Sequence, residues 1–306
     1  MTSKRAFTLL ELLVAATITV GIATLLLAVA QTVLRTWHAA NGRWSTLGAA
    51  GPALDQIERD LRSAVAFRSE STFFTATILL DSGNSGIWVN PGRFSKPTSE
   101  ITLADAISDC RFGATSWLRF FIGSAGTSSD RSMVRAVSYQ IVRRPLSGTT
   151  DENAYILFRG IVNEANTMAA GNDIVANGFQ GMNATEGNAG NIRRPNANQV
   201  LADNVVDFGV RLYARTSDGL FPLFPASGGA WNSGPLSFEL RGNSPRDTVP
   251  VLAEVMIRVL TDEGAQKLRM FEDPLHAAPL PVSWWSFVEE HSHVYVRRIW
   301  LTNYKP

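Results

Sequence analysis

The stretch that decides this fold reads KRAFTLLELLV over residues 4–14 and continues as LLVAATITVGIATLLLAVA over residues 12–30. Between Arg5 and Arg35 the only charged residue is Glu11. An apolar run of about 20 residues is long enough to cross the hydrocarbon core as a helix. A carboxylate inside such a span costs about 2.5–3.5 kcal/mol on insertion scales, so it normally has a function. The sequence therefore predicts a membrane helix with a functional acid near its start.

The basic residues around the span predict its orientation. Lys4 and Arg5 precede it, and positive charges favour the cytoplasmic side of a membrane segment. Arg35 follows the span and weakens this asymmetry slightly. We expect a cytoplasmic N-terminus and an outer, extracytoplasmic remainder.

Two other readings of the N-terminus remain open. A secretory signal peptide also has basic residues and an apolar core, and Ala28-Val29-Ala30 would serve as its cleavage site, leaving Gln31 first. Glu11 disfavours this reading, and so does the helical pattern that continues beyond Ala30. An uncleaved anchor is the other possibility. In either case the chain would be a secreted or signal-anchored extracytoplasmic binding protein or hydrolase that does not assemble.

The residues around Phe7 resemble the class III signal of type IV prepilins and type II secretion pseudopilins, whose motif is similar to G-F-T-L-x-E. The resemblance implies cleavage between Ala6 and Phe7, N-methylation of Phe7, and use of Glu11 in assembly. Ala6 departs from the family pattern, which usually has Gly there. Because Ala is the smallest alternative, we expect processing to be retained at a lower rate.

Cleavage before Phe7 would give Glu11 a partner. It frees an α-amine, which is cationic at neutral pH, and Glu11 of one subunit can meet that amine on a neighbour in a staggered helical bundle. An unpaired charge in a low-dielectric setting is far more costly than a paired one, so this pair would select the correct register. The alternative is a Glu11 that stays protonated or reaches back to the membrane interface.

A weaker resemblance covers much of the remaining chain. The J-type minor pseudopilins show a similar order of segments, matched here by residues 54–62, 117–120, 139–144, 155–159, 205–213 and 250–257. The closing residues 294–299 and the overall length are more similar to the Verru_Chthon cassette protein C family. These matches are patterns of strands and contain no catalytic signature.

Together the resemblances imply a minor, pilin-like structural subunit of a pseudopilus or pilus, and not an enzyme. Its expected partners are a prepilin peptidase and methylase, other pilin-like subunits through the N-terminal helix, an inner-membrane assembly platform and membrane lipid. No cofactor and no nucleic acid are expected. The implied location is the bacterial inner membrane, crossed once, with the C-terminal domain in the periplasm.

Composition fits one membrane helix and one large outer domain. The 28 basic and 27 acidic residues nearly balance, which gives no indication of a nucleic-acid surface. Cys110 is the single cysteine, so it cannot form an intrachain disulfide and is expected to be an inert thiol. The expected organisation is a leader at 1–6, a membrane and assembly helix at 7–34, a helical continuation at 35–68, and a β-rich outer domain at 69–306 with long loops at 81–115, 163–199 and 216–247.

The helical continuation is expected to break once. Gly48, Gly51 and Pro52 disfavour a regular helix, so we expect a kink or short break with a second helix starting at Pro52. The stripe Leu54, Ile57, Leu61 and Val65 then has helical spacing and would pack on a sheet or, alternatively, on a partner. Acid-to-base pairs four residues apart, Asp55–Arg59 and Glu58–Arg62, would lie on the exposed side. Trp37 and Trp44 suit a membrane interface or a packed helix face.

Beyond residue 67 the pattern changes to alternating and β-branched runs, which predict strands. The expected strands are 73–80, 117–122, 134–144, 155–160, 205–213, 250–261 and 292–301, with a helix at 262–270. Short connections favour antiparallel pairing. Trp88 and Trp231 are expected to bring two of the long loops back onto the sheet, and 163–199 is expected to be an extended surface insertion. The predicted class is α+β, with the outer end of the long helix packed on antiparallel sheet in a pilin-like arrangement.

Catalytic motifs are absent from the sequence, including phosphate loops, dinucleotide fingerprints, nucleophile elbows, C-x-x-C and H-E-x-x-H. Glu289, His291 and His293 alternate, so on a strand they would share a face and could bind a metal. Their neighbours Trp284, Trp285 and Phe287 favour ordinary packing instead. The arginine pairs are expected to be solvated or to lie at strand edges; they are Arg143-Arg144, Arg193-Arg194 and Arg297-Arg298.

Overall fold

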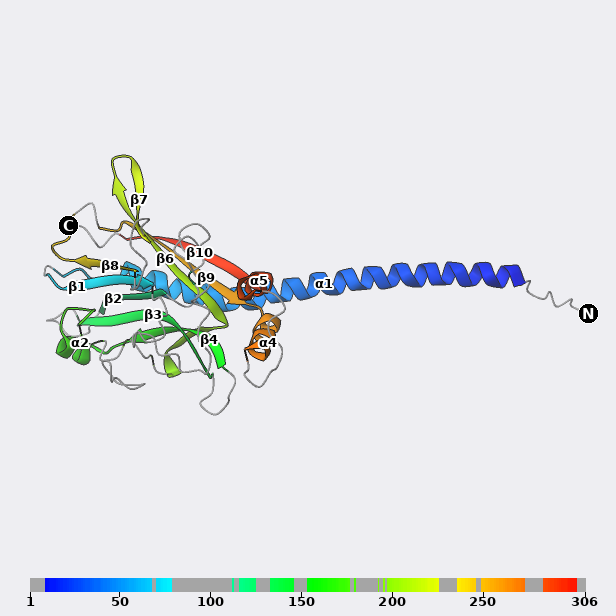
Figure 1. Cartoon of the computed structure of the whole chain (residues 1–306), viewed down its shortest axis with the longest axis horizontal. Helices are drawn as coiled ribbons and strands as arrows, with labels where there is room; N and C mark the ends of the chain where they lie inside the picture. Colours follow the sequence, from blue (N-terminus) through cyan, green and yellow to red (C-terminus); the bar gives the residue numbers. More distant parts are fainter. Residues whose placement is uncertain are drawn as a thin grey trace, which may run out of the picture. The chain divides into compact units, whose positions relative to one another are not determined.

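The structure, a computed structural model (Figure 1), describes residues 9–67, 70–78, 112, 116–124, 133–145, 153–176, 179, 192, 195, 197–225, 236–245, 249–272 and 283–301. The chain divides into two compact units, Met1–Ser45 and Thr46–Pro306. Several residues singled out from the sequence lie outside the described residues, namely Ala6, Phe7, Trp88, Cys110, Arg193, Arg194 and Trp231.

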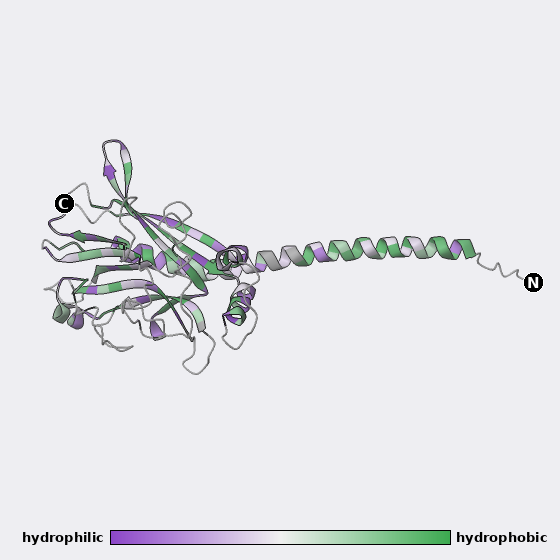
Figure 2. Ribbon diagram, viewed as in Figure 1, coloured by the Kyte–Doolittle hydropathy of each residue, from purple (hydrophilic) through white to green (hydrophobic). Residues whose placement is uncertain are grey.

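The described part of the first unit, residues 9–45, belongs to helix α1, which runs over Leu9–Arg62. The segment Leu9–Leu34 is long and apolar enough to cross a membrane, and none of its most apolar window is buried within the chain. Figure 2 shows it as a largely hydrophobic ribbon. Its threonine hydroxyls bond back to helix carbonyls; for example, Thr17 and Thr24 donate to Val14 and Val20 over 2.8 Å. Polar groups in lipid must be satisfied internally, so these threonines are compatible with a membrane span.

The expected break at Pro52 is wrong, because α1 continues through it to Arg62 as one helix of 54 residues. Pro52 is exposed, while Ala53, Leu54 and Ile57 around it are buried. An interior proline costs about 3 kcal/mol. Burying a leucine or isoleucine side chain stabilises by about 1.5–3 kcal/mol each, so the packed face outweighs that cost.

The second unit contains two antiparallel sheets. Sheet A has the order β5-β4-β3-β2-β1-β8, and sheet B has the order β10-β9-β6-β7. The strands are β1 Thr72–Ile78, β2 Ser116–Ser124, β3 Met133–Pro145, β4 Asn153–Ile161, β5 Val200–Asp203, β6 Val205–Thr216, β7 Gly219–Phe224, β8 Leu236–Arg241, β9 Leu252–Leu260 and β10 Ser292–Trp300. The other helices are α2 Glu164–Ala170, the 3-10 turn η4 Ala197–Gln199, α4 Asp262–Phe271 and α5 Trp284–Glu290.

All seven predicted strands and the predicted helix at 262–270 are present, with ends displaced by a few residues at most. The prediction missed β5, β7, β8, α2 and α5. These elements are short, and β7 contains Pro222, which makes its pattern atypical of a strand. The α+β class and the antiparallel pairing are confirmed.

The core lies where residues 46–62 of α1 meet both sheets. The predicted stripe packs there: Leu54, Ile57 and Leu61 are buried, while Val65 is only partly buried. On the facing side of sheet A, aromatic rings stack along neighbouring strands, with Phe120 between Phe74 and Tyr139. The helix end therefore packs on sheet, as expected.

Two of the predicted loops contribute to this unit's packing rather than only to its surface. In the stretch 163–199, Ile174, Phe179 and Ile192 are fully buried. The carbonyl of Ile192 accepts hydrogen bonds from Ser138 and Gln140 on the face of sheet A that points away from α1. The prediction of a surface insertion is thus wrong for these residues, because they cover a sheet face that would otherwise expose buried groups. In the stretch 216–247, β7 and β8 extend both sheets.

Candidate assembly helix and its anchoring

Glu11 lies in the first turn of α1 and is exposed to the surroundings of the chain. A negative charge in the first turn of a helix is favoured by the helix dipole. Since the segment around it is apolar, Glu11 is an ionisable group within a candidate membrane span. The predicted processing residues Ala6 and Phe7 cannot be placed beside it, because they precede the described residues.

Asp60 anchors the other end of α1 to sheet A. This carboxylate is only 4% exposed. It accepts hydrogen bonds from Arg159 Nε at 2.6 Å and Nη2 at 3.0 Å on β4, from the Tyr139 hydroxyl on β3, and from Gln56 Nε2 at 2.9 Å on its own helix. Four donors on one buried carboxylate compensate for the removal of its charge from water. We call Asp60, Tyr139 and Arg159 the helix clamp.

The clamp changes the acid-base properties of Tyr139 and Arg159. Burial, and next the neighbouring Asp60 charge, raise the pKa of the Tyr139 hydroxyl well above its ordinary value. Burial disfavours the charge on Arg159, but its hydrogen bonds and attraction to Asp60 outweigh this and raise the pKa of its guanidinium. Tyr139 therefore stays protonated and donates, and Arg159 stays cationic.

Sheet B holds the same helix through an exposed ion pair and a part-buried hydroxyl contact. Arg297 on β10 pairs with Asp55 and, at 3.0 Å, with Glu58. Closer to the start of the unit, the hydroxyls of Thr46 and Tyr295 lie 2.9 Å apart. The arginine pair 297–298 is thus engaged by carboxylates, and Arg298 Nε contacts Glu254 at 2.8 Å.

Of the two acid-to-base pairs expected along the helix, one forms. Glu58 and Arg62 are 2.6 Å apart, as predicted. Asp55 instead pairs across to Arg297, while Arg59 donates to Gln56. A cross-element arginine competes for Asp55 because tertiary packing places it on the same side of the helix.

These contacts determine both the rotation and the height of residues 46–62 on the sheets. Successive residues of an α-helix are about 100° apart and rise 1.5 Å each, so a shift by one residue would turn Asp60 away from Tyr139 and Arg159. A misplaced helix would leave a partly buried cation and a buried hydroxyl without their carboxylate, which would cost up to about 3–5 kcal/mol. The clamp is therefore a register device between helix and sheet.

A second buried ion pair lies beside α4. Arg143 on β3 is 2% exposed and pairs with Glu272 at 2.9 Å, which corrects the expectation that it is solvated. Tyr155 and Trp284 also donate to Glu272, at 2.8 and 3.1 Å. Burial, followed by the Glu272 charge, raises the pKa of Tyr155 well above its ordinary value. This cluster joins α4 and α5 to sheet A.

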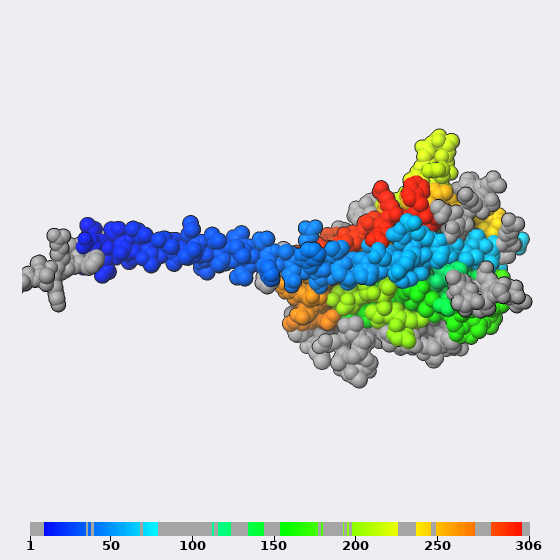
Figure 3. Space-filling view, turned by 180° about the vertical axis from the view of Figure 1, so that it is seen from behind, coloured from blue at the N-terminus to red at the C-terminus, as the bar shows by residue number. Residues whose placement is uncertain are grey.

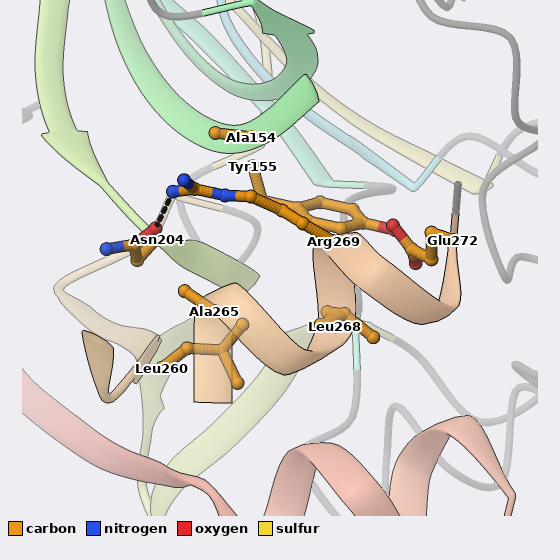
Figure 4. Close-up of a pocket in the computed structure, with 8 residues that line it drawn as sticks. All are labelled: Ala154, Tyr155, Asn204, Leu260, Ala265, Leu268, Arg269 and Glu272. Atoms are coloured by element: carbon orange, nitrogen blue, oxygen red, sulfur yellow. Dashed lines mark hydrogen bonds between the residues drawn. The ribbon is translucent and has the colours of Figure 1, made fainter. Parts of the chain in front are cut away.

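A small cavity adjoins that cluster (Figure 4). It is lined by Ala154, Tyr155, Asn204, Leu260, Ala265, Leu268, Arg269 and Glu272. Arg269 closes one side by donating to Asn204 Oδ1 over 3.1 Å, and the Tyr155 hydroxyl meets Glu272 at the other. Its volume of about 10 Å³ is what one water molecule needs, so it does not fit a substrate or an organic cofactor.

The weak metal candidates Glu289, His291 and His293 do not share a strand face. Glu289 lies in α5, His291 follows that helix, and His293 lies in β10. The His291 ring stacks on Phe287 at 4.3 Å between centroids, and its Nδ1 lies 3.0 Å from the Phe287 carbonyl. No group of three or more His, Cys, Asp or Glu side chains suitable for a metal occurs among the described residues. The alternation failed as an indicator because α5 ends between the first and second candidates.

The sequence analysis did not predict the helix clamp, although Asp60 lies between Ile57 and Leu61 of the predicted buried stripe. Its position on the buried stripe, three residues after Ile57, was the available signal.

Comparisons with protein-family models, with characterised proteins and with solved structures give no match to this chain.

Proposed function

We propose that this chain is a minor, pilin-like structural subunit, held in a membrane by α1 and assembled with similar subunits through that helix. The observation that carries the proposal is α1 itself. One continuous helix contains an unburied apolar segment with Glu11 near its start, and ends in residues that two sheets bind tightly. A subunit that is mounted by its helix needs both properties.

The assembly step follows from charge. Cleavage between Ala6 and Phe7 creates a new α-amine four residues before Glu11. Glu11 of one subunit pairs with the amine of a neighbour, and any other stagger leaves both charges unpaired in a low-dielectric layer. N-methylation of Phe7 keeps the amine cationic. The prepilin peptidase and methylase, an inner-membrane assembly platform, sister subunits and lipid are the partners in this scheme.

The proposal also includes the location of the chain and the kind of protein it is. The span is single, with a cytoplasmic N-terminus and the two-sheet unit in the periplasm. The subunit is a structural protein rather than an enzyme. In support, the Arg143–Glu272 and Arg159–Asp60 ion pairs join α4 and α1 to sheet A.

N-terminal sequencing of the full chain, extracted from bacterial membranes that contain a prepilin peptidase, tests the processing. N-methyl-phenylalanine from Phe7 is the expected first residue. A first residue of Gln31 would favour the secreted protein, and an intact Met1 would favour the simple anchor. Either result would refute the proposal.

Glu11→Ala tests the assembly role separately. We expect the variant to insert and to be cleaved at Phe7, but to be absent from sheared or purified assemblies. Glu11→Asp is the matched control, because it keeps the charge and should retain part of the incorporation. Normal incorporation of Glu11→Ala would eliminate the ion-pair mechanism even if cleavage is confirmed.

A further inference from the structure

Sheet B has a face that points away from α1, and part of it is exposed. Along β10, Tyr295 and Arg297 reach α1, so the alternate residues Val294, Val296, Arg298 and Trp300 point outward. Val296 is 54% exposed and Trp300 is 49% exposed. Figure 3 shows β10, in red, at the surface beside α1.

The register extends this face across the sheet. Arg298 pairs with Glu254, which pairs with Arg211, and Trp300 pairs with Leu252, which pairs with Tyr213. Paired residues share a face, so these side chains form rows that run from β10 to β6. Arg215, two residues beyond Tyr213, lies with its guanidinium 5.9 Å from the centre of the Trp300 ring. We call this set the β10 face.

Among the described residues, Phe112 covers one part of the β10 face. Phe112 is buried over β6, where its amide donates to Asp207 Oδ1 at 3.0 Å and its ring lies against Gly209. The outward residues of β10, namely Val294, Val296, Arg298 and Trp300, remain exposed, and so does Arg215 beside Trp300. In the described part of the sheet β10 is also the edge strand.

The exposed part of this face is both apolar and basic. Of the charged residues on this face, Arg215 and Arg298 are exposed, Arg211, Arg258 and Glu254 are partly buried, and Asp207 is fully buried. The two carboxylates are engaged by arginines of the same face: Asp207 lies 3.7 Å from Arg258, and Glu254 contacts Arg298. Among the described residues, the two charged side chains that this face exposes are therefore both arginines, in a chain whose overall net charge is only +1.

We propose that the β10 face is a docking surface for an acidic, extended segment of another protein, which lies along β10 with apolar side chains on Val294, Val296 and Trp300. Tryptophan and arginine are the residues most often dominant in protein interfaces, and here they adjoin. The exposed arginines Arg215 and Arg298 favour an acidic partner, and the nine-residue edge strand suits an extended one. This surface is separate from α1 and does not depend on the proposed assembly role.

Fluorescence anisotropy on the full chain in nanodiscs of uncharged lipid tests the docking. The probes are two labelled peptides as long as β10, both alternating valine with a charged residue, one with glutamate and the other with lysine. We expect the glutamate peptide to bind more tightly, and to bind less tightly as salt is added. Equal binding of the two peptides would overturn the proposal.

Matched variants locate the site. Trp300→Ala should weaken binding of the glutamate peptide by about tenfold or more, as for a central interface residue. Trp44→Ala removes an even more exposed tryptophan, 73% exposed, from α1 and should change nothing. Arg215→Glu should weaken binding, whereas Arg241→Glu, on β8 of sheet A, should not.

Analytical ultracentrifugation of the same nanodiscs distinguishes other occupants. If the chain dimerises and Trp300→Ala abolishes the dimer, the β10 face binds a second copy and the proposal is wrong. If nanodiscs with anionic lipid displace the glutamate peptide from the unmodified chain and not from Arg215→Glu, the face is a lipid-binding surface, which would also overturn it.

Discussion

Replacing Asp60 with asparagine would remove the negative charge of the helix clamp and leave the size of the side chain nearly unchanged. In the folded protein the carboxylate accepts from Arg159 at 2.6 and 3.0 Å, and from the Tyr139 hydroxyl. An asparagine offers one acceptor oxygen, and its amide group faces donors. The partly buried guanidinium of Arg159 and the buried hydroxyl of Tyr139 then compete for a single neutral acceptor.

The expected loss in the free energy of unfolding is large for a single substitution that keeps the size of the side chain. Hydrogen bonds to charged groups contribute about 1.5–3 kcal/mol each, and breaking a buried ion pair costs about 3–5 kcal/mol. The Arg159 side chain is 22% exposed and retains some water, so we expect about 3 kcal/mol from Asp60→Asn. For a domain of this size that corresponds to a melting temperature lower by about 6–12 °C.

Asp55→Asn is the matched control, because Asp55 is an aspartate of the same helix that also pairs with a strand arginine. Its side chain is 59% exposed, so the pair is worth about 1 kcal/mol or less. Thermal unfolding of the full chain in detergent, followed by circular dichroism, measures both variants. Equal effects of the two substitutions, or an effect of Asp60→Asn below about 1 kcal/mol, would refute the argument from burial.

Two further predictions concern packing and pH. A Cβ at Gly209 would lie 2.1 Å from the Phe112 ring, so Gly209→Ala should lower the free energy of unfolding by about 1–3 kcal/mol. A Cβ at Gly51 in α1 would meet nothing within 4 Å, so Gly51→Ala should raise the free energy of unfolding by up to about 1 kcal/mol. Urea titrations measure both variants. Stability should also fall as pH rises above about 10, because the pKa values of Tyr139 and Tyr155 are raised in the folded state and the unfolded chain loses these protons first. The slope is about 1.4 kcal/mol per pH unit for each tyrosine, and Tyr139→Phe should reduce it; a slope unchanged by that substitution would count against the assignment.

Local signals accounted for much of this fold. The apolar helix is evident from its length and composition, since both are properties of a continuous stretch. The strands from β1 to β4, and β6, β9 and β10, were predicted because they are runs rich in β-branched and aromatic residues, and in β10 exposed positions also alternate with less exposed ones. Short elements such as β8 and α5 escaped, because a few residues carry too little periodicity.

The tertiary structure decided what the charges do. Asp60 looks like one more acid on an amphipathic helix, and its partners Tyr139 and Arg159 are 79 and 99 residues away. In the sequence, Arg143 is one of two adjacent arginines that are expected to be solvated, but in the structure it pairs with Glu272 at the end of α4. Pro52 predicts a break that packing overrides. Periodicity and span length act between neighbours in the chain and can be read from it, but the burial of a charge depends on which distant donors arrive beside it.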